Sequence, residues 1–415
     1  MKIGIVSQWF RPEPAYLPTN LADDLAERGH EVRVLTGFPN YPDGKIYPGY
    51  RQRWGELTRE GEISLRRVPL YASHDSSALK RIGNYLSFAA TSSAAAVRYL
   101  ADVDAIYVYL TPATVAAAPE LLRKLRGIPV VIHVQDLWPE SVTSSSMGPK
   151  GAVARLTDRV LHKAMKHIYA ASAAVAVIAP TMRDIVIRRG ADPAKTRVVL
   201  NWADETLFHP VPATAESRQA IGYRDRCTIM FAGTMGPFQN IHASVRAATA
   251  VSGANNVDLV FVGSGIAQES AQKLATELRA TNVRFLGRRP AADMPALYSA
   301  ADYQLVTLRD LPIFHGTIPS KLQAALACGS PVVVSAPGDC TTLVENHGIG
   351  LACQPDDWRA LANCFSQAAK TPPSERIEMA RRASALYAAE MSRPACVDQL
   401  EAMLIEAAAH RRPTR

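Results

Sequence analysis

Short apolar runs and amphipathic stretches alternate along the whole chain. Met1–Ser7 and His30–Thr36 are apolar runs of the length that buried strands have, and Thr19–Arg28 between them is a helical stretch that ends at Gly29. This pattern predicts a strand–helix–strand unit of Rossmann type. The first loop, Gln8–Pro18, lacks the G-x-G-x-x-G pattern, which disfavours dinucleotide binding at this turn and a Rossmann dehydrogenase.

The alternation begins again after a polar segment that contains several prolines. Apolar runs such as Thr228–Ala232 and Tyr303–Thr307 predict the strands of a second sheet. We therefore expect an α/β protein with two doubly wound, Rossmann-like domains facing across a cleft, at residues 1–204 and 205–391. An amphipathic helix in the tail, at about 392–415, is expected to pack back on the first domain.

Length and composition support this organisation. A chain of 415 residues is too long for one ordinary core, and its 48% hydrophobic and 20% charged residues are typical of soluble proteins. No apolar run approaches the roughly 18–20 residues that span a bilayer. The N-terminus, Met1–Phe10, predicts a strand rather than a signal peptide, so we expect a cytoplasmic protein.

Cysteines and charge narrow the classes of partner. The six cysteines form no C-x-x-C pair and have apolar neighbours, which predicts small buried side chains in a reducing compartment rather than a metal site or disulfides. A net charge of +8 favours nucleic acid, a polyanionic nucleotide ligand or an anionic membrane face. No basic-aromatic RNA module is present, so the last two are preferred to nucleic acid.

One predicted helix combines basic and apolar residues. In the stretch Ala78–Leu100, Lys80 and Arg81 stand beside Ile82, Tyr85, Leu86 and Phe88. Such a helix can lie on a membrane surface. The alternative is a helix that packs on the sheet and exposes two basic residues to solvent.

The stretch from His315 to Ser335 carries the strongest chemical signal. A turn-forming segment precedes a helix that Pro319 or Ser320 opens and Gly329 ends, and a buried strand follows. The first turn of this helix offers free N–H groups, and Lys321 adds a positive charge beside them. A phosphate or pyrophosphate fits this arrangement. The alternative is an ordinary helix–strand connection with a surface lysine.

A second group of polar residues follows a strand of the first domain. Gln135 to Ser141 come directly after the apolar run Pro129–Val134, and in a parallel sheet such residues lie in the ligand crevice. Asp136 and Glu140 are therefore site candidates, although an aspartate here can also cap the next turn. The loop Gly37–Arg53 contains Tyr41 and is unusually long, as functional loops often are.

Several motifs together resemble one family. RGHEVRVLTG (28–37), KTRVVLNWADETLFHP (195–210), IMFAGTMG (229–236), LVFVGSG (259–265), VRFLGRRPAADMPALYSAAD (283–302) and PSKLQAALACGSPVVVS (319–335) are similar, in order and spacing, to the retaining GT-B glycosyltransferases of family 4. GFPNYPDGKIYPGY (37–50) and HVQDLWPES (133–141) resemble the branch that builds O-antigen, capsule and exopolysaccharide units on a polyprenyl carrier.

The chain departs from the wider family at several positions. Gly316 and Ala324 stand where the family has a pair of glutamates in the donor loop and helix, and the second of these usually holds the donor ribose. Thr234 and Gln239 stand where it often has the Arg and Lys of a diphosphate clamp, and Gln135 replaces a histidine. We interpret these differences as a subfamily pattern in an active enzyme.

The resemblance implies front-side attack, in which the donor's β-phosphate takes the acceptor proton. Lys321 is the first candidate to neutralise the leaving diphosphate, Arg288 is the second, and Asp136 would orient a hydroxyl group. The other expected donor-binding residues are Gly233, Thr234, Gln239, Gly263, Thr317, Pro319, Ser320 and Gln323. The expected acceptor-binding residues are Tyr41, His133, Gln135 and Glu140. No D-x-D-like motif ends a strand, so neither a metal nor a cofactor is expected.

The implied substrates are a nucleotide-sugar, with UDP as the nucleotide, and a polyprenyl-diphosphate-linked saccharide at the inner face of the plasma membrane. Two alternatives share the fold. A nucleotide-sugar 2-epimerase would need several carboxylates and histidines, whereas the donor loop offers only His315. A non-catalytic nucleotide-sugar-binding subunit would bind the nucleotide but neither transfer nor hydrolyse the sugar.

Overall fold

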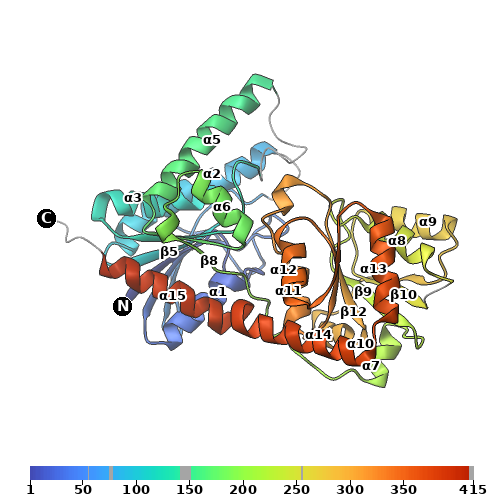
Figure 1. The fold of residues 1–415 in the computed structure, drawn as a ribbon. Helices are drawn as coiled ribbons and strands as arrows, with labels where there is room; N and C mark the ends of the chain where they lie inside the picture. Colours follow the sequence, from blue (N-terminus) through green and yellow to red (C-terminus); the bar gives the residue numbers. More distant parts are fainter. Residues whose placement is uncertain (55, 74–77, 141–150, 254–255, 411–415) are drawn as a thin grey trace. The chain divides into compact units, whose positions relative to one another are not determined.

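The computed structural model describes residues 1–54, 56–73, 78–140, 151–253 and 256–410 (Figure 1). The chain forms two compact units. Unit 1 contains Met1–Leu200 and the chain from Cys396 onward, and unit 2 contains Asn201–Ala395. Ser141 and residues 411–415, which belong to segments discussed above, lie outside the described residues.

Unit 1 is built on an eight-stranded sheet within the described part of the chain, in the order β3-β4-β2-β1-β5-β6-β7-β8. The strands are β1 Lys2–Val6, β2 Glu31–Gly37, β3 Glu56–Glu60, β4 Ile63–Val68, β5 Ala105–Leu110, β6 Val130–Val134, β7 Ala174–Val177 and β8 Thr196–Val198. Neighbours pair in parallel except β3, which is antiparallel to β4. All five residues of β6 are buried, as expected for a parallel strand with both faces covered.

The helices of unit 1 connect these strands. They are α1 Tyr16–Glu27, α2 Ala78–Tyr99, η1 Ala113–Ala116, α3 Ala117–Arg126, α5 Gly151–Ala171, α6 Pro180–Arg188 and η2 Pro193–Lys195. Helix α15, Arg393–Ala409, crosses from unit 2 into unit 1 and buries Leu400 and Leu404. Its Glu401 pairs with Arg28, and its Glu406 accepts a hydrogen bond of 2.6 Å from Arg197. Apolar burial and ion pairs therefore attach the tail to unit 1.

Unit 2 contains a six-stranded parallel sheet among the described residues, in the order β11-β10-β9-β12-β13-β14. Its strands are β9 Cys227–Ala232, β10 Val257–Val262, β11 Val283–Phe285, β12 Tyr303–Thr307, β13 Val332–Ser335 and β14 Gly350–Cys353. The helices are α7 Ala215–Ala220, α8 Ile241–Ala250, α9 Gln268–Glu277, η3 Ala291–Asp293, α10 Met294–Ala300, η4 Pro312–Phe314, α11 Ser320–Ala327, α12 Asp339–His347, α13 Trp358–Lys370, α14 Pro373–Leu386 and the π-helical turn η5 Tyr387–Met391.

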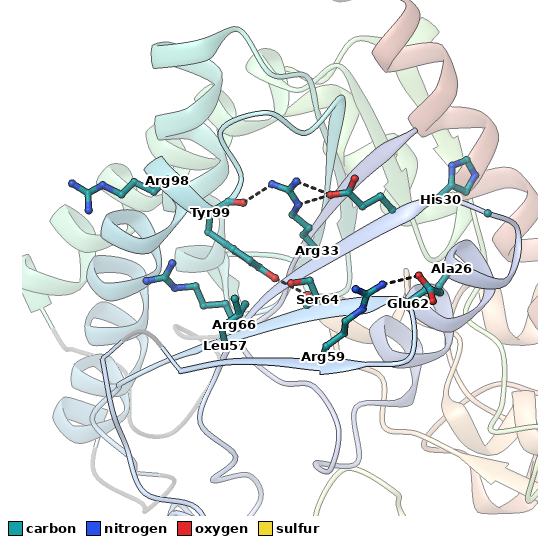
Figure 2. Close-up of a pocket in the computed structure, with 12 residues that line it drawn as sticks. Ala26, His30, Arg33, Leu57, Arg59, Glu62, Ser64, Arg66, Arg98 and Tyr99 are labelled. Atoms are coloured by element: carbon teal, nitrogen blue, oxygen red, sulfur yellow. Dashed lines mark hydrogen bonds and ion pairs between the residues drawn. The ribbon is translucent and has the colours of Figure 1, made fainter.

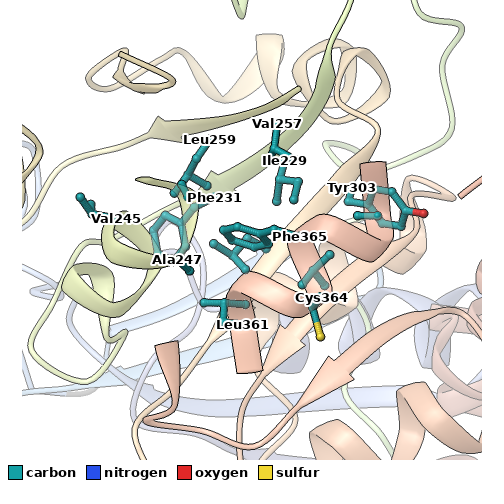
Figure 3. Close-up of a cluster of buried hydrophobic side chains, with 14 of the residues drawn as sticks. Ile229, Phe231, Val245, Ala247, Val257, Leu259, Tyr303, Leu361, Cys364 and Phe365 are labelled. Atoms are coloured by element: carbon teal, nitrogen blue, oxygen red, sulfur yellow. The ribbon is translucent and has the colours of Figure 1, made fainter. Parts of the chain in front are cut away.

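An apolar cluster supports the sheet of unit 2 (Figure 3). The rings of Phe231 and Phe261 lie 5.7 Å apart, and Phe261 stacks on Phe285 at 4.8 Å. Phe365 of α13 and Val245 of α8 cover these strands and are fully buried. This close-packed cluster fixes β9 and β10, so the loops that follow these strands begin at rigid positions.

Candidate active site

The strand order of unit 2 creates a switch point between β9 and β12. From β9 the chain builds outward through β10 and β11, and it then returns to β12 on the other side. Loops that leave the carboxyl ends of two such strands diverge, and the opening between them is the usual ligand site of an open α/β sheet. The loop at Gly233 and the segment that leads into α11 occupy these two positions.

Three glycines allow the loops after β9 and β10 to pack backbone against backbone. A Cβ atom on Gly263 would lie 2.0 Å from the carbonyl oxygen of Gly233, and one on Gly265 would lie 2.3 Å from that of Met235. The amide of Gly233 donates to Val262 O at 2.8 Å, with φ at +122°. Only glycine, which has no Cβ, fits these close contacts. At Gly233 the bare backbone, with no side chain, therefore faces α11.

Lys321 lies against that bare backbone. A Cβ on Gly233 would stand 2.9 Å from Lys321 Cε, and Lys321 Nζ lies 5.1 Å from the centre of the Phe231 ring. Burial lowers the pKa of Lys321. Among the described residues no carboxylate pairs with its ammonium. A partly buried cation at the start of α11, with no carboxylate partner in the described part of the chain, offers a site for an anion.

The remaining predicted residues in and just before α11 stabilise the turn or are exposed to solvent. Pro319 precedes the helix, and Ser320 is exposed at its first position without making a cap. Thr317 Oγ1 donates to Ile313 O at 3.0 Å. Gln323 is buried and donates to Ile318 O at 3.2 Å, which fixes the loop rather than reaching outward.

The other predicted donor residues lie on the loops after β9 and β10. Thr234 is exposed. Gln239 Oε1 accepts from the amide of Gly236 at 3.0 Å, and its carbonyl accepts from Thr307 at 2.5 Å. Arg288 Nε donates to Ser264 Oγ at 2.5 Å and is otherwise exposed. The structure therefore brings Gly233, Gly263 and Lys321 together, and it attaches Arg288 to the residue after Gly263.

A polar network that the sequence did not indicate joins three loops at this edge of unit 2. Asp356, after β14, accepts from Asn240 Nδ2 and from the amide of Asp310, both at 2.8 Å. Asp310 in turn accepts from His315 Nε2 at 2.8 Å. These contacts hold the segment between β12 and α11 in a defined position.

Unit 1 has its own switch point, between β1 and β5. Asp136 follows β6 and accepts a hydrogen bond of 2.7 Å from Thr111, which follows β5. Asp136 is solvent-accessible, yet the protein atoms around it raise its pKa by desolvation. Burial also raises the pKa of Tyr109 and Tyr85, and the nearby charge of Asp136 contributes to both shifts.

Tyr85 and Tyr109 lie near this carboxylate, and further aromatic side chains lie close to them. The rings of Tyr85 and Trp138 lie 6.3 Å apart, and those of Trp9 and Tyr41 lie 5.3 Å apart. We call Trp9, Tyr41, Tyr85, Tyr109 and Trp138 the aromatic cluster. Aromatic faces beside a carboxylate suit a polyhydroxylated ring, because the rings cover its C–H groups and the carboxylate accepts from hydroxyls.

Glu13 is a buried residue of this region that no motif indicated. Its Oε1 accepts from the amides of Asn40 and Tyr41, each at 2.8 Å, and its Oε2 accepts from Phe10 at 3.2 Å. Burial raises the pKa of Glu13 to about 7, against the opposing effect of these backbone donors. Glu13 thus connects the loop after β1 to the loop that carries Tyr41.

Two predicted acceptor residues lie elsewhere. His133 is fully buried within β6, between Tyr107 Oη at 2.9 Å and Val199 O at 3.3 Å, and burial lowers its pKa to about 4. Burial opposes ionisation of Glu140, but Arg189 binds it at 2.5 Å and lowers its pKa. His133 therefore stabilises β6, and Glu140 stabilises the loop that follows β6. Gln135 lies beside Asp136 and is largely buried.

Family models match both halves of the chain. The model described as "Glycosyl transferase 4-like domain" matches residues 16–202, and the model "Glycosyl transferases group 1" matches residues 214–385. The chain belongs to the family 4 glycosyltransferases. The predicted fold class, α/β with two Rossmann-like domains, is confirmed by the parallel sheets and by the structural likenesses below.

The relatives of this family 4 glycosyltransferase include the putative colanic acid biosynthesis glycosyl transferase WcaI of Escherichia coli K12. This chain is 27% identical to WcaI over 366 residues, which cover 85% of this chain and 88% of WcaI. Sucrose-phosphate synthase from Thermosynechococcus elongatus matches with a TM-score of 0.73 at 19% identity, covering 98% and 99% of the two chains. HepE from Anabaena, solved with UDP and glucose, matches with a TM-score of 0.66 at 18% identity, covering 98% and 99%. The two structures show the fold.

Two further properties concern the described residues of this glycosyltransferase. No helix there combines the length and the apolar character needed to cross a bilayer. No group of three or more His, Cys, Asp or Glu side chains in the same described residues has an arrangement that could hold a metal ion. Gly316 and Ala324, which replace the family glutamates, are both buried.

Proposed function

We propose that this glycosyltransferase moves a sugar, with retention of configuration, from a UDP-sugar to a polyprenyl-diphosphate-linked saccharide at the inner face of a bacterial plasma membrane. Unit 2 would bind the donor and unit 1 the acceptor. The observation that carries the proposal is the partly buried Lys321 ammonium, beside bare backbone at Gly233 and the start of α11, with no carboxylate partner among the described residues. The colanic acid relative and the UDP and glucose in HepE support the substrate classes.

In the donor half of the reaction, Lys321 Nζ and the first amides of α11 would bind the diphosphate. The bond between the anomeric carbon and the β-phosphate oxygen breaks, and negative charge grows on the leaving UDP. A lysine ammonium and N–H dipoles fixed before the reaction stabilise that charge without reorganising. Arg288, held by Ser264, would add positive potential.

In the acceptor half, a hydroxyl group attacks the anomeric carbon on the face that UDP leaves, and its proton passes to a β-phosphate oxygen. Configuration is then retained without an enzyme carboxylate as nucleophile. Asp136, held by Thr111, would accept a hydrogen bond from an acceptor hydroxyl and orient it. The aromatic cluster would cover the apolar face of the acceptor sugar.

Other predicted site residues take supporting roles in this proposal. Gln239, Thr317 and Gln323 hold donor loops through the hydrogen bonds described above. His133 and Glu140 hold the loop that carries Asp136 and Gln135. We further propose that transfer needs no metal, because Lys321 and the helix amides can supply the positive charge that a cation would otherwise bring.

The experiment is transfer by the purified chain, with UDP-, GDP- and ADP-sugars as donors and a polyprenyl-diphosphate-linked disaccharide as acceptor. We expect product from a UDP-sugar, with the anomeric configuration of the donor retained by NMR. Product from a GDP-sugar alone would replace the donor class. Inversion of configuration would refute the front-side mechanism, and nucleotide binding without transfer or hydrolysis would indicate a binding subunit.

A further inference from the structure

Exposed apolar side chains concentrate in one part of unit 1. Twelve large hydrophobic side chains are exposed among the described residues, and six of them fall between residues 54 and 86. They are Trp54, Leu57, Tyr71, Leu79, Ile82 and Leu86, with exposed fractions from 44% for Ile82 to 81% for Leu79. Scattered single residues would need no explanation, but half of the total within one short segment does.

Helix α2 separates a buried face from an apolar exposed face. Asn84 and Phe88 point inward and are at most 2% exposed. Leu79, Ile82 and Leu86 are spaced by three and four residues, so they form one stripe on the outward side. A soluble helix normally places polar residues on that side.

Tyr71 joins this stripe. Tyr71 is fixed on α2, because its amide donates to Ser87 Oγ and its carbonyl accepts from Asn84 Nδ2, both at 2.8 Å. A Cβ on Gly83 would lie 3.4 Å from the Tyr71 ring. Gln52 accepts from the amide of Leu70 at 2.7 Å, which brings the segment before β3 to the same place.

A basic trough of about 860 Å³ lies at the other end of α2 (Figure 2). Two of its arginines are neutralised, Arg33 by Glu31 and Asp102 and Arg59 by Glu62.

The other two arginines of the trough, Arg66 and Arg98, have no carboxylate partner among the described residues. Arg66 lies 5.7 Å above the Tyr99 ring, and its Nε is buried without a hydrogen-bond partner. Leu57 stands directly opposite Arg66 in the β3–β4 pair, so both side chains share one face. Figure 2 shows Arg66 and Arg98 extending away from the neutralised pair.

We infer that the α2 stripe and this trough form a docking face for an anionic phospholipid bilayer. Leu79, Ile82 and Leu86 enter the headgroup and acyl boundary, and Arg66 and Arg98 bind lipid phosphates. The apolar stripe lies near the start of α2, and Arg66 and Arg98, which have no carboxylate partner among the described residues, lie near its end. Apolar and cationic groups along one helix complement a surface that is apolar below and anionic above. This inference rests on the proposed function, because a lipid-linked acceptor must be met at a membrane.

The same helix connects this docking face to the acceptor region. Tyr85 belongs to the aromatic cluster near Asp136, while its neighbours Ile82 and Leu86 belong to the stripe. Docking through Ile82 and Leu86 would therefore bring Tyr85, and with it the acceptor region of unit 1, close to the bilayer surface. From that position Asp136 would face a sugar attached to a membrane-embedded diphosphate.

The test is co-sedimentation of the full chain with vesicles of equal parts phosphatidylglycerol and phosphatidylethanolamine, compared with pure phosphatidylcholine. We expect binding to the anionic vesicles. Ile82→Ser with Leu86→Ser should weaken it about tenfold or more. Arg66→Gln with Arg98→Gln should weaken it about 30-fold, since each cation near an anionic surface contributes about 1 kcal/mol.

Matched controls come from exposed residues of unit 2. Ile266→Ser with Ile377→Ser removes two apolar side chains that are 83% and 70% exposed, and Arg246→Gln with Lys273→Gln removes two exposed charges. The inference is wrong if the parent does not bind anionic vesicles, or if the control variants lose as much binding as the α2 and arginine variants.

Transfer to a short-chain, water-soluble acceptor separates this inference from the proposed function. The docking variants should retain that activity while losing transfer to an acceptor embedded in vesicles. A parent that binds vesicles but transfers to neither acceptor would refute the proposed function and leave the docking face supported. A parent that transfers to both acceptors without binding vesicles would refute the docking face alone.

Discussion

Replacing Lys321 with methionine tests the donor site, because it removes the ammonium and keeps an unbranched side chain against Phe231. In the free protein two effects oppose each other. The variant loses a cation–π contact of about 0.5–2 kcal/mol, but it no longer holds a charge in a place that lowers its pKa. Methionine also makes favourable contacts with aromatic rings. We therefore expect the melting temperature without ligand to change little.

Nucleotide binding should change much more. A hydrogen bond to a charged group contributes about 1.5–3 kcal/mol, and a loss of about 2 kcal/mol weakens UDP binding about 30-fold. At a UDP concentration of about 100 times the parent Kd, binding stabilises the parent by about 2.7 kcal/mol. At the same concentration the stabilisation of Lys321→Met falls to about 0.9 kcal/mol. For a unit of about 200 residues, the thermal shift falls from about 5–11 °C to about 2–4 °C.

The assay is thermal unfolding with and without UDP, on the parent, Lys321→Met and the control Lys273→Met. Lys273 is an exposed lysine of α9 in the same unit, so its loss should leave the shift intact. An undiminished UDP shift in Lys321→Met would refute the assignment of this ammonium to the diphosphate. A shift lost equally in both variants would point to a general effect of charge.

Three further predictions concern the close approach at Gly263, the buried carboxyl group of Glu13 and the need for a metal. Gly263→Ala should lower the free energy of unfolding in urea by about 3 kcal/mol or more, because its Cβ would lie 2.0 Å from Gly233 O. The control Gly29→Ala, which has open space around it at φ +85°, should lower it by about 1–2 kcal/mol. Equal losses in the two variants would contradict the close approach at Gly263. Because the folded pKa of Glu13 is raised from 4.5 to about 7, its stabilising contribution should be complete below about pH 4.5 and lost as the pH rises through 7, by up to about 3 kcal/mol. Between about pH 4.5 and 7 and above, the parent should therefore lose stability relative to Glu13→Gln. Parallel plots of unfolding free energy against pH for the two proteins would refute this role of Glu13. Transfer should persist in EDTA after purification without added metal, and its abolition would show that a cation is required.

The sequence predicted the parts of the molecule that depend on local pattern. Buried runs such as Val332–Ser335 could be placed because both faces of a parallel strand are apolar. The start of α11 at Ser320 followed from Pro319, and the turn at Gly233 followed from a glycine directly after a strand. These signals lie within a few residues of the feature that they predict.

Features that depend on distant residues could not be predicted. Glu13 is positioned by amides that lie 27 and 28 residues away, and Glu140 pairs with Arg189, 49 residues away. His133 was expected to bind the acceptor and is fully buried; in a strand buried on both faces the sequence does not reveal which way a polar side chain points. Helix α12 was not expected, because only Cys340 and Val344 in it are buried.

The path of the chain between the two units has a consequence for recombination. Unit 2 is one continuous stretch, whereas unit 1 is made of Met1–Leu200 and the chain from Cys396 onward. In genetic terms unit 2 is an insert within unit 1, and the chain crosses between the units at two junctions. A hybrid that takes Asn201–Ala395 from a relative therefore keeps the native α15 contacts of Arg28 and Arg197, whereas a single crossover near residue 200 would replace the partners of both arginines. Unit 2, with the donor-binding role that we propose for it, can thus be exchanged as one segment if both junctions are used.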